Sequence, residues 1–189
     1  VKDMATLVRG FAAGHAKCPR LRLLIAGDGP EKDKLTALAA ELGVERQVCF
    51  AGWISGGMDR VYSALDINAL TSLSETFPYA LTEGARFHLA TVSTAVGGIP
   101  YLIDQDVNGY LFQPGDWQAL GNDLAALGND DELRRRLGEK LYEKASTQFS
   151  IQKTVSTQLQ IYASILRRHR RRSSARDGVV ICGAYGRGN

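Results

Sequence analysis

Short apolar runs that suit β-strands alternate with amphipathic runs that suit α-helices along this chain, and this order constrains the fold more than any other feature. The strand-like runs are residues 21–26, 47–51, 66–71 and 91–94. The helical runs around them are residues 3–17, 35–42, 58–64 and 78–88. Strands joined by helices form parallel sheets whose faces the helices cover. The sequence therefore predicts an α/β fold, a Rossmann-like parallel sheet with helices on both faces.

The second half of the chain adds a turn and several more helices. Asn108-Gly109 lies between the apolar runs 101–103 and 110–112, a pattern typical of a β-hairpin or another tight turn. Leucines at helical spacing then predict two helices between residues 120 and 141, followed by a last amphipathic helix over 151–166.

Charge divides the chain into a body and a basic tail. The 189 residues are 44% hydrophobic with a net charge of +3, which is enough for one well-buried α/β domain. Residues 1–166 carry 16 Lys and Arg against 19 Asp and Glu, whereas residues 167–172 hold five arginines. We expect a folded domain in residues 1–166 that is incomplete at its N-terminal end. A basic linker in 167–178 and the start of a further domain or a tail in 179–189 would follow.

The composition argues against several kinds of partner. The body is not basic, so we do not expect it to bind nucleic acid. No apolar run approaches the length of a membrane-spanning helix. The three cysteines are far apart, which indicates a reducing, cytoplasmic location. The arginine run in residues 167–172 is expected to be a solvated linker. The alternative is that it binds nucleic acid, or anionic lipid at the inner face of a membrane as a peripheral contact.

Two carboxylates, Glu75 and Glu83, are the strongest candidate site residues. Glu75 follows the strand-like run 66–71, at the edge where ligands bind to sheets of this kind. Glu83 lies one turn into the helix that follows. Carboxylates accept hydrogen bonds from hydroxyl groups, so the pair suits a ligand with hydroxyls at both ends. The alternative is that both are solvated surface charges.

The helix start between these carboxylates adds a phosphate-binding feature. Pro78 is expected to be the first helical residue, where its missing N–H costs nothing. The amides of Tyr79, Ala80 and Leu81 are then expected to lack helical partners and to form an anion site. A ligand with a phosphate between two hydroxyl-bearing groups fits this pattern.

Seven motifs occur in order along residues 1–166. They are Val1-Lys2-Asp3, Leu24 to Pro30, Val48 to Trp53, Tyr62 to Asp66, the pair Glu75 and Glu83, Ala95 to Pro100, and Asn108 to Asp116. In this order they resemble the C-terminal, donor-binding domain of retaining GT-B glycosyltransferases of family 4. Thr76 stands where that family usually has glycine, and threonine resists the positive φ that glycine allows.

The resemblance implies a role for each site residue. Glu75 would contact the donor sugar, Lys2 would neutralise the diphosphate leaving group, and Glu83 would bind the ribose. Five residues would line the sugar and diphosphate with their backbone: Phe77, Pro78, Tyr79, Ala80 and Leu81. Two further residues, Trp53 and Ile54, would lie beside the nucleobase. The resemblance also implies no metal and no cofactor, with a UDP-sugar or GDP-sugar as donor substrate.

By the same resemblance the chain is half of a hexosyltransferase-type enzyme. The other half, an N-terminal domain, would bind a glycan or lipid-linked acceptor, so we expect this chain alone to bind a nucleotide sugar without transferring it. Two alternatives stay open: a non-catalytic nucleotide-sugar-binding module, and a sugar-nucleotide epimerase of the same fold.

Two further segments have competing interpretations. Asp104-Gln105-Asp106 has the spacing of a metal-binding carboxylate pair, although a polar turn is the simpler interpretation. Residues 181–189 are similar to the opening of polysaccharide pyruvyl transferases, and the alternative is a disordered tail.

Overall fold

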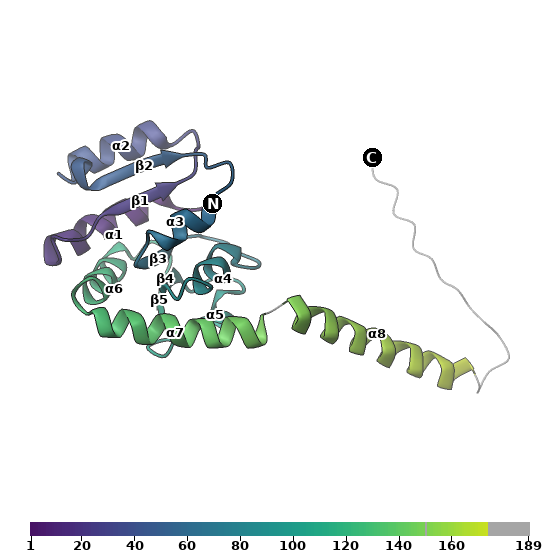
Figure 1. Cartoon of the computed structure of the whole chain (residues 1–189). Helices are drawn as coiled ribbons and strands as arrows, with labels where there is room; N and C mark the ends of the chain where they lie inside the picture. Colours follow the sequence, from purple (N-terminus) through teal and green to yellow (C-terminus); the bar gives the residue numbers. More distant parts are fainter. Residues whose placement is uncertain (150, 174–189) are drawn as a thin grey trace, which may run out of the picture. The chain divides into compact units, whose positions relative to one another are not determined.

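The computed structural model describes residues 1–149 and 151–173, and it divides the chain into two compact units. Unit 1 is Val1–Gln148 and unit 2 is Phe149–Asn189. Unit 1 holds every strand in the described part of the chain (Figure 1).

Helices and strands alternate through unit 1 in the predicted order. The elements are α1 (Met4–Lys17), β1 (Leu23–Ala26), α2 (Lys32–Glu41), the 3-10 helix η1 (Glu45–Gln47), β2 (Val48–Gly52), α3 (Met58–Ser63), β3 (Ile67–Leu70), α4 (Tyr79–Ala85), β4 (Ala90–Thr94), α5 (Ile99–Leu102), β5 (Tyr110–Phe112), α6 (Trp117–Asn129) and α7 (Asp131–Gln148).

All strand pairs are parallel, and they form two sheets. One sheet has the order β1-β2 and the other has the order β3-β4-β5. β4 is paired on both sides, and all five of its residues are buried. This arrangement confirms the predicted α/β, Rossmann-like fold with parallel strands and covering helices.

The core lies where α1 and α6 pack against the strands. Leu7, Val92 and Leu120 belong to one buried cluster, and a second cluster lies between α1, α2 and the first sheet. Glycines let α1 and α6 approach closely: a Cβ added at Gly10 would lie 2.5 Å from a Leu120 methyl carbon. The two helices need small residues at this contact, because a larger side chain there would push the helices apart.

The predicted hairpin around Asn108-Gly109 is wrong, whereas the tight turn is present. Residues 99–102 form helix α5, and β5 pairs in parallel with β4, Val92 lying opposite Tyr110. The Asn108 side chain holds the turn by accepting from the Asp104 amide at 2.7 Å and donating to the Leu102 carbonyl at 3.1 Å. Asn108-Gly109 therefore forms a turn between a helix and a parallel strand.

Unit 2 contains α8 (Ile151–Ser173), which continues beyond the predicted end at 166 and includes the arginine run. Val155, Leu159, Tyr162 and Leu166 recur at helical spacing and are exposed in this chain. None of the helices in the described residues is both long enough and apolar enough to cross a membrane. The predicted domain limit at 166 stays a prediction, and residues 174–189, with the end of the expected linker and the pyruvyl-transferase-like segment, lie outside the described residues.

Candidate functional site

Glu75 lies on a loop that hydrogen bonds hold from two sides. On one side, the Thr71 hydroxyl donates to the Lys2 carbonyl at 2.7 Å, and the Leu73 amide donates to the Val1 carbonyl at 2.9 Å. On the other side, the Gly98 amide donates to the Glu75 carbonyl at 3.2 Å. The loop after β3 is therefore fixed between the start of the chain and the segment after β4.

The glycines after β4 make the second of these contacts possible. A Cβ added at Gly97 would lie 1.6 Å from the Glu75 carbonyl oxygen, and one at Gly98 would lie 2.4 Å from the Thr76 carbonyl oxygen. Gly97 also has a φ of +54°, which few other residues adopt without strain. Thr76 itself is not among the described residues with positive φ, so its conformation does not require a glycine.

Lys2 and Glu75 form an ion pair across this loop. The Lys2 ammonium lies 2.9 Å from a Glu75 carboxylate oxygen. The Lys2 side chain is 56% exposed, whereas that of Glu75 is 17% exposed. The structure therefore brings together the two residues that the sequence suggests for catalysis, although they lie 73 positions apart in the chain.

Asp3 places Lys2 directly before a helix. Its carboxylate accepts from the Thr6 amide at 3.3 Å and from the Thr6 hydroxyl at 2.7 Å, which caps the N-terminus of α1. The cap residue has a left-handed conformation, with φ of 45°. Lys2 directly precedes this cap, and its side chain extends from there to Glu75.

The predicted anion site at the start of α4 is only partly present. Pro78, with φ of −83° and ψ of 74°, caps the helix, so it is not the first helical residue as expected. The Tyr79 amide donates to the Phe77 carbonyl at 3.0 Å, and the Leu81 amide donates to the Pro78 carbonyl at 3.0 Å. These local bonds occupy two of the three amides that the sequence predicts to be free. The tight turn before the helix explains the difference, because it supplies carbonyl acceptors that a regular helix start lacks.

Glu83 projects from α4 and is held by a tyrosine that the sequence analysis did not single out. The Tyr62 hydroxyl, from α3, donates to a Glu83 carboxylate oxygen at 2.9 Å. Tyr62 is 6% exposed and its ring stacks on Phe87 with centroids 5.6 Å apart. Burial, and then the hydrogen bond to Glu83, raise the pKa of the Tyr62 hydroxyl well above its usual range, so it remains a donor.

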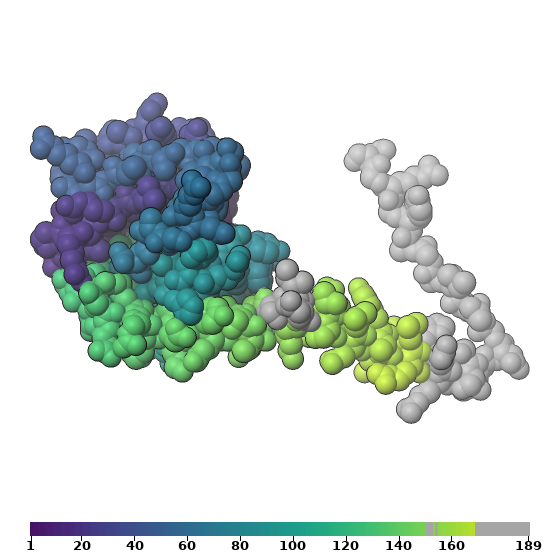
Figure 2. All heavy atoms as spheres, in the orientation of Figure 1, coloured from purple at the N-terminus to yellow at the C-terminus, as the bar shows by residue number. Residues whose placement is uncertain are grey.

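A shared acceptor joins α3, β3 and α4 beside Glu83. The Ala80 carbonyl accepts from the Asn68 amide group at 2.9 Å and lies 3.4 Å from the Tyr62 hydroxyl. Asn68 is buried on β3, and a Cβ at Gly84 would overlap it. On the face shown in Figure 2, the blue and teal segments around α3 and α4 adjoin each other, as these contacts require. Tyr62 begins the sequence motif Tyr62 to Asp66, but nothing in the sequence indicates that its side chain contacts Glu83.

Trp53 and Ile54, suggested for the nucleobase, directly follow β2. Trp53 is 79% exposed, so its indole face is available to a ligand. The end of β2 is marked by Gly52, which has a φ of +68° and whose carbonyl accepts from the Gly27 amide at 2.8 Å. The structure places Trp53 and Ile54 in a segment directly after a strand, as expected.

The Asp104 and Asp106 pair has other contacts. The Asp104 carboxylate accepts from the Lys144 ammonium at 2.7 Å, and Asp106 accepts from Gln105 at 3.3 Å. No group of three or more possible metal ligands occurs within residues 1–149 and 151–173. The observed contacts are those of a polar turn.

Comparison with known proteins identifies the family. The family model described as glycosyl transferases group 1 matches residues 1–144. The chain belongs to this family. It is 34% identical over 167 residues to N-acetyl-alpha-D-glucosaminyl L-malate synthase of Bacillus anthracis, covering 88% of this chain and 43% of the relative. It is 32% identical over 153 residues to D-inositol 3-phosphate glycosyltransferase of Corynebacterium glutamicum, covering 77% and 37%.

Solved structures agree with the fold. HepE of Anabaena, solved in complex with UDP and glucose, superposes with a TM-score of 0.75 at 25% identity, over 88% of this chain and 45% of that chain. The crystal structure of TarM superposes with a TM-score of 0.77 at 20% identity, over 85% and 32%. The chain therefore shares the fold of one part of these GT-B glycosyltransferases, and it spans less than half the length of these relatives.

Proposed function

We propose that this chain is the donor-binding half of a retaining, metal-independent glycosyltransferase. The enzyme would move a hexosyl group from a UDP-sugar or GDP-sugar to a glycan or lipid-linked acceptor that a second, N-terminal domain binds. One observation carries the proposal: two carboxylates with separate supports, Glu75 and Glu83, lie before and within α4, and a lysine reaches the first of them. HepE, a structural relative, was solved with UDP and glucose.

The proposed roles follow from the chemistry of each group. Glu83 would accept hydrogen bonds from ribose hydroxyls while Tyr62 holds its carboxylate in place. Lys2 would exchange its partner Glu75 for the diphosphate and stabilise the negative charge that develops on the leaving group. Glu75, released from the ion pair, would accept from sugar hydroxyls. The backbone of residues 77–81 would line the ligand between them, with Trp53 and Ile54 at the base.

The first experiment measures nucleotide binding by the 189-residue chain. We expect UDP or GDP to raise the melting temperature, because a ligand that binds only the folded state stabilises it. Glu83→Gln should weaken nucleotide affinity by about tenfold or more, since hydrogen bonds to charged groups contribute about 1.5–3 kcal/mol. Glu75→Gln should leave UDP affinity nearly unchanged, because its proposed contact is with the sugar.

Glu41→Gln is the matched control, because Glu41 is an exposed carboxylate at the end of a different helix, α2. Equal nucleotide affinities for Glu83→Gln and Glu41→Gln would contradict the ribose role. In the full-length enzyme, Glu75→Gln should abolish most sugar transfer while a chelator leaves transfer intact. A requirement for Mg²⁺ or Mn²⁺ would contradict the metal-independent mechanism. Measurable transfer by the 189-residue chain alone would contradict its role as half of a site.

A further inference from the structure

Helix α8 combines an apolar face with an excess of positive charge. The helix runs from Ile151 to Ser173 and includes the whole arginine run in residues 167–172 (Figure 1). Its sequence contains Lys153 and five arginines, and it contains no aspartate or glutamate. No carboxylate within the helix can therefore neutralise these cations by pairing with them from three or four residues away.

Apolar side chains cover one broad side of α8. A helix turns by about 100° per residue, so four of these side chains lie within about 60° of one another around the helix axis: Val155, Leu159, Tyr162 and Leu166. Their exposed fractions range from 47% to 65%. Ile161 and Ile165, which are 51% and 54% exposed, widen this α8 apolar face to about 160°. Lys153, Gln160 and Arg167 lie on the opposite side, so the helix is amphipathic.

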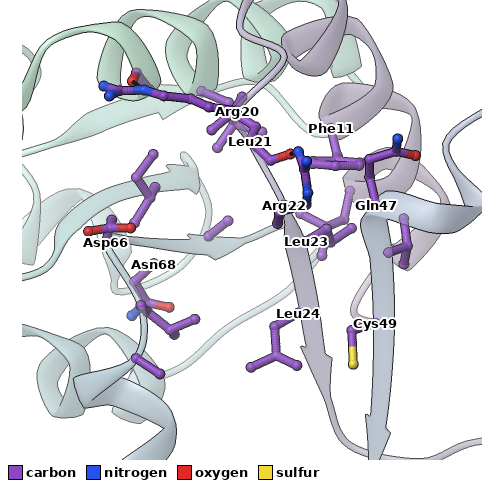
Figure 3. A pocket seen from close by; sticks show the side chains of 18 of the residues that line it. Phe11, Arg20, Leu21, Arg22, Leu23, Leu24, Gln47, Cys49, Asp66 and Asn68 are labelled. Atoms are coloured by element: carbon purple, nitrogen blue, oxygen red, sulfur yellow. Dashed lines mark hydrogen bonds between the residues drawn. The ribbon is translucent and has the colours of Figure 1, made fainter.

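Two arginines of unit 1 show the contrast, because acceptors of the same chain bind them. Arg20 donates to the Gly128 carbonyl at 2.6 Å and to the Asp131 carboxylate at 2.7 Å. Arg22 donates to two nearby backbone carbonyls, each at 2.8 Å. Figure 3 shows both arginines in the segment that leads into β1. Residues 1–148 also carry 15 Lys and Arg against 19 Asp and Glu, so the excess positive charge of the described residues lies in α8.

Nucleic acid fits only the charge of α8. Its phosphates would pair with the arginines, and such pairing supplies most of the non-specific affinity of proteins for nucleic acid. Its outer surface is made of sugar and phosphate, however, so it would leave the leucine and isoleucine side chains of the α8 apolar face in water. The apolar face therefore requires a partner that has hydrocarbon of its own.

A second copy of α8 fits only the apolar face. The first four of its apolar side chains have the 4-3-4 spacing of a coiled-coil seam. Paired coiled-coil helices place acidic and basic residues beside this seam, whereas α8 offers no carboxylate to the arginines of a partner in either orientation. Ile161 and Ile165 also make the α8 apolar face wider than such a seam.

An anionic lipid surface fits both features. Helices that lie in a membrane interface bury an apolar face about 5–10 Å into the boundary between head groups and acyl chains. Their lysines and arginines are attracted to anionic lipids. Arg168 lies at the margin of the α8 apolar face, from where a long side chain can reach head-group phosphates. Because the opposite side of the helix is polar, α8 would lie along the surface.

We propose that α8 binds the surface of a membrane that contains anionic lipid. The α8 apolar face enters the head-group boundary, and the arginines pair with lipid phosphates. The proposal concerns α8 alone and does not depend on which ligand the Glu75 and Glu83 site binds.

The first test measures sedimentation of the 189-residue chain with lipid vesicles. One set contains phosphatidylcholine alone, and the other contains phosphatidylcholine and phosphatidylglycerol in equal parts. The chain should bind the anionic vesicles at least about a hundredfold more tightly, since each Lys or Arg near such a surface strengthens binding by about fivefold. Salt should weaken the binding because it screens the charges. Equal affinity for both sets, or no binding to either, would overturn the proposal.

A double variant tests the arginines. Arg167→Gln with Arg168→Gln should weaken binding to the anionic vesicles by about tenfold or more. The matched control is Arg135→Gln with Arg136→Gln, which removes the same charge from two adjacent, exposed arginines of α7. It should change vesicle affinity by less than about twofold, because these arginines lie outside α8. Equal weakening by both double variants would assign the binding to net charge and contradict a role of α8.

A substitution in the apolar face tests the hydrocarbon contact. Leu159→Gln should weaken binding to the anionic vesicles by about tenfold, because a leucine that enters the interface is removed from water. Val107→Gln is the control: Val107 is 54% exposed, but it lies in unit 1. If Leu159→Gln binds as the unchanged chain does, binding is electrostatic alone and the proposed insertion is wrong.

The other partners of α8 give different results. Amide hydrogen exchange in α8 should slow when anionic vesicles are added and should be fast without them, because the helix then lacks a partner. Strong protection in the vesicle-free monomer would overturn the proposal, since the chain itself would then cover the apolar face. Protection that grows with protein concentration would assign the face to a second copy. Tighter binding to duplex DNA than to anionic vesicles, at equal phosphate concentration, would assign α8 to nucleic acid.

Discussion

Glu75 and Glu83 lie close together in the sequence, and the protein fixes them by different means. The main chain at Glu75 is held by hydrogen bonds and by close contact with glycines, while its carboxylate meets an exposed lysine. The main chain at Glu83 is part of a helix, and its carboxylate is held by a buried tyrosine. Glu75 is therefore fixed through its backbone and can change its side-chain partner, whereas Glu83 is fixed through its side chain.

The largest expected effect comes from the backbone support of Glu75. Gly97→Ala should lower the free energy of unfolding by about 3 kcal/mol, because the new Cβ would overlap the Glu75 carbonyl oxygen and φ is positive there. Urea denaturation measures the change. Gly115→Ala is the control: its φ is +81°, but nothing lies within 4 Å of the added Cβ. It should cost only about 1–2 kcal/mol. Equal losses would show that the contact with the Glu75 loop contributes nothing.

An intermediate effect is expected from the support of the Glu83 carboxylate. Tyr62→Phe should cost about 1 kcal/mol of stability, since it removes one hydrogen bond and leaves the ring stacked on Phe87. Nucleotide affinity should fall, and the melting temperature should fall by about 2–4 °C. Tyr101→Phe, at a tyrosine that is 76% exposed, is the matched control and should leave both unchanged.

The stabilisation by Tyr62 should disappear at high pH. Its pKa is raised in the folded protein, mainly by burial, so the unfolded chain loses the phenolic proton first, near pH 10. Unfolding is then favoured progressively as the pH rises above about 10. Urea denaturation should show the full difference in unfolding free energy between the wild type and Tyr62→Phe at about pH 8. This difference should be smaller at about pH 10.5. A difference that grows over this range would contradict the assignment.

The smallest effect on stability is expected from Lys2→Met. An ion pair with an exposed lysine contributes at most about 0.5 kcal/mol, and salt should weaken it further. Lys140→Met, which breaks the exposed pair with Glu143, is the control and should lower the free energy of unfolding by a similarly small amount. The two should differ in binding, where only Lys2→Met weakens nucleoside diphosphate affinity, by about tenfold.

The sequence predicted most of the fold because alternation of strands and helices is a local pattern. It also predicted that Glu75 follows a strand and that Glu83 lies on the next helix. It did not predict that Asn108-Gly109 joins a helix to a parallel strand, because the same turn residues serve both connections. The contact between Tyr62 and Glu83 was also missed, since it depends on how α3 packs against α4. Nor did the pattern show that local carbonyls would occupy the amides of Tyr79 and Leu81.

The Asp3 cap has a consequence for how the site forms. Lys2 precedes the cap of α1, so the same local structure that starts the helix also directs the ammonium group towards Glu75. The Lys2 carbonyl also accepts from the Thr71 hydroxyl, so its main chain is held by the Glu75 loop as well as by the helix that follows. The cap at Asp3 and the loop of Glu75 therefore both fix the main chain at Lys2, and loss of the Asp3 carboxylate would remove one of these two supports.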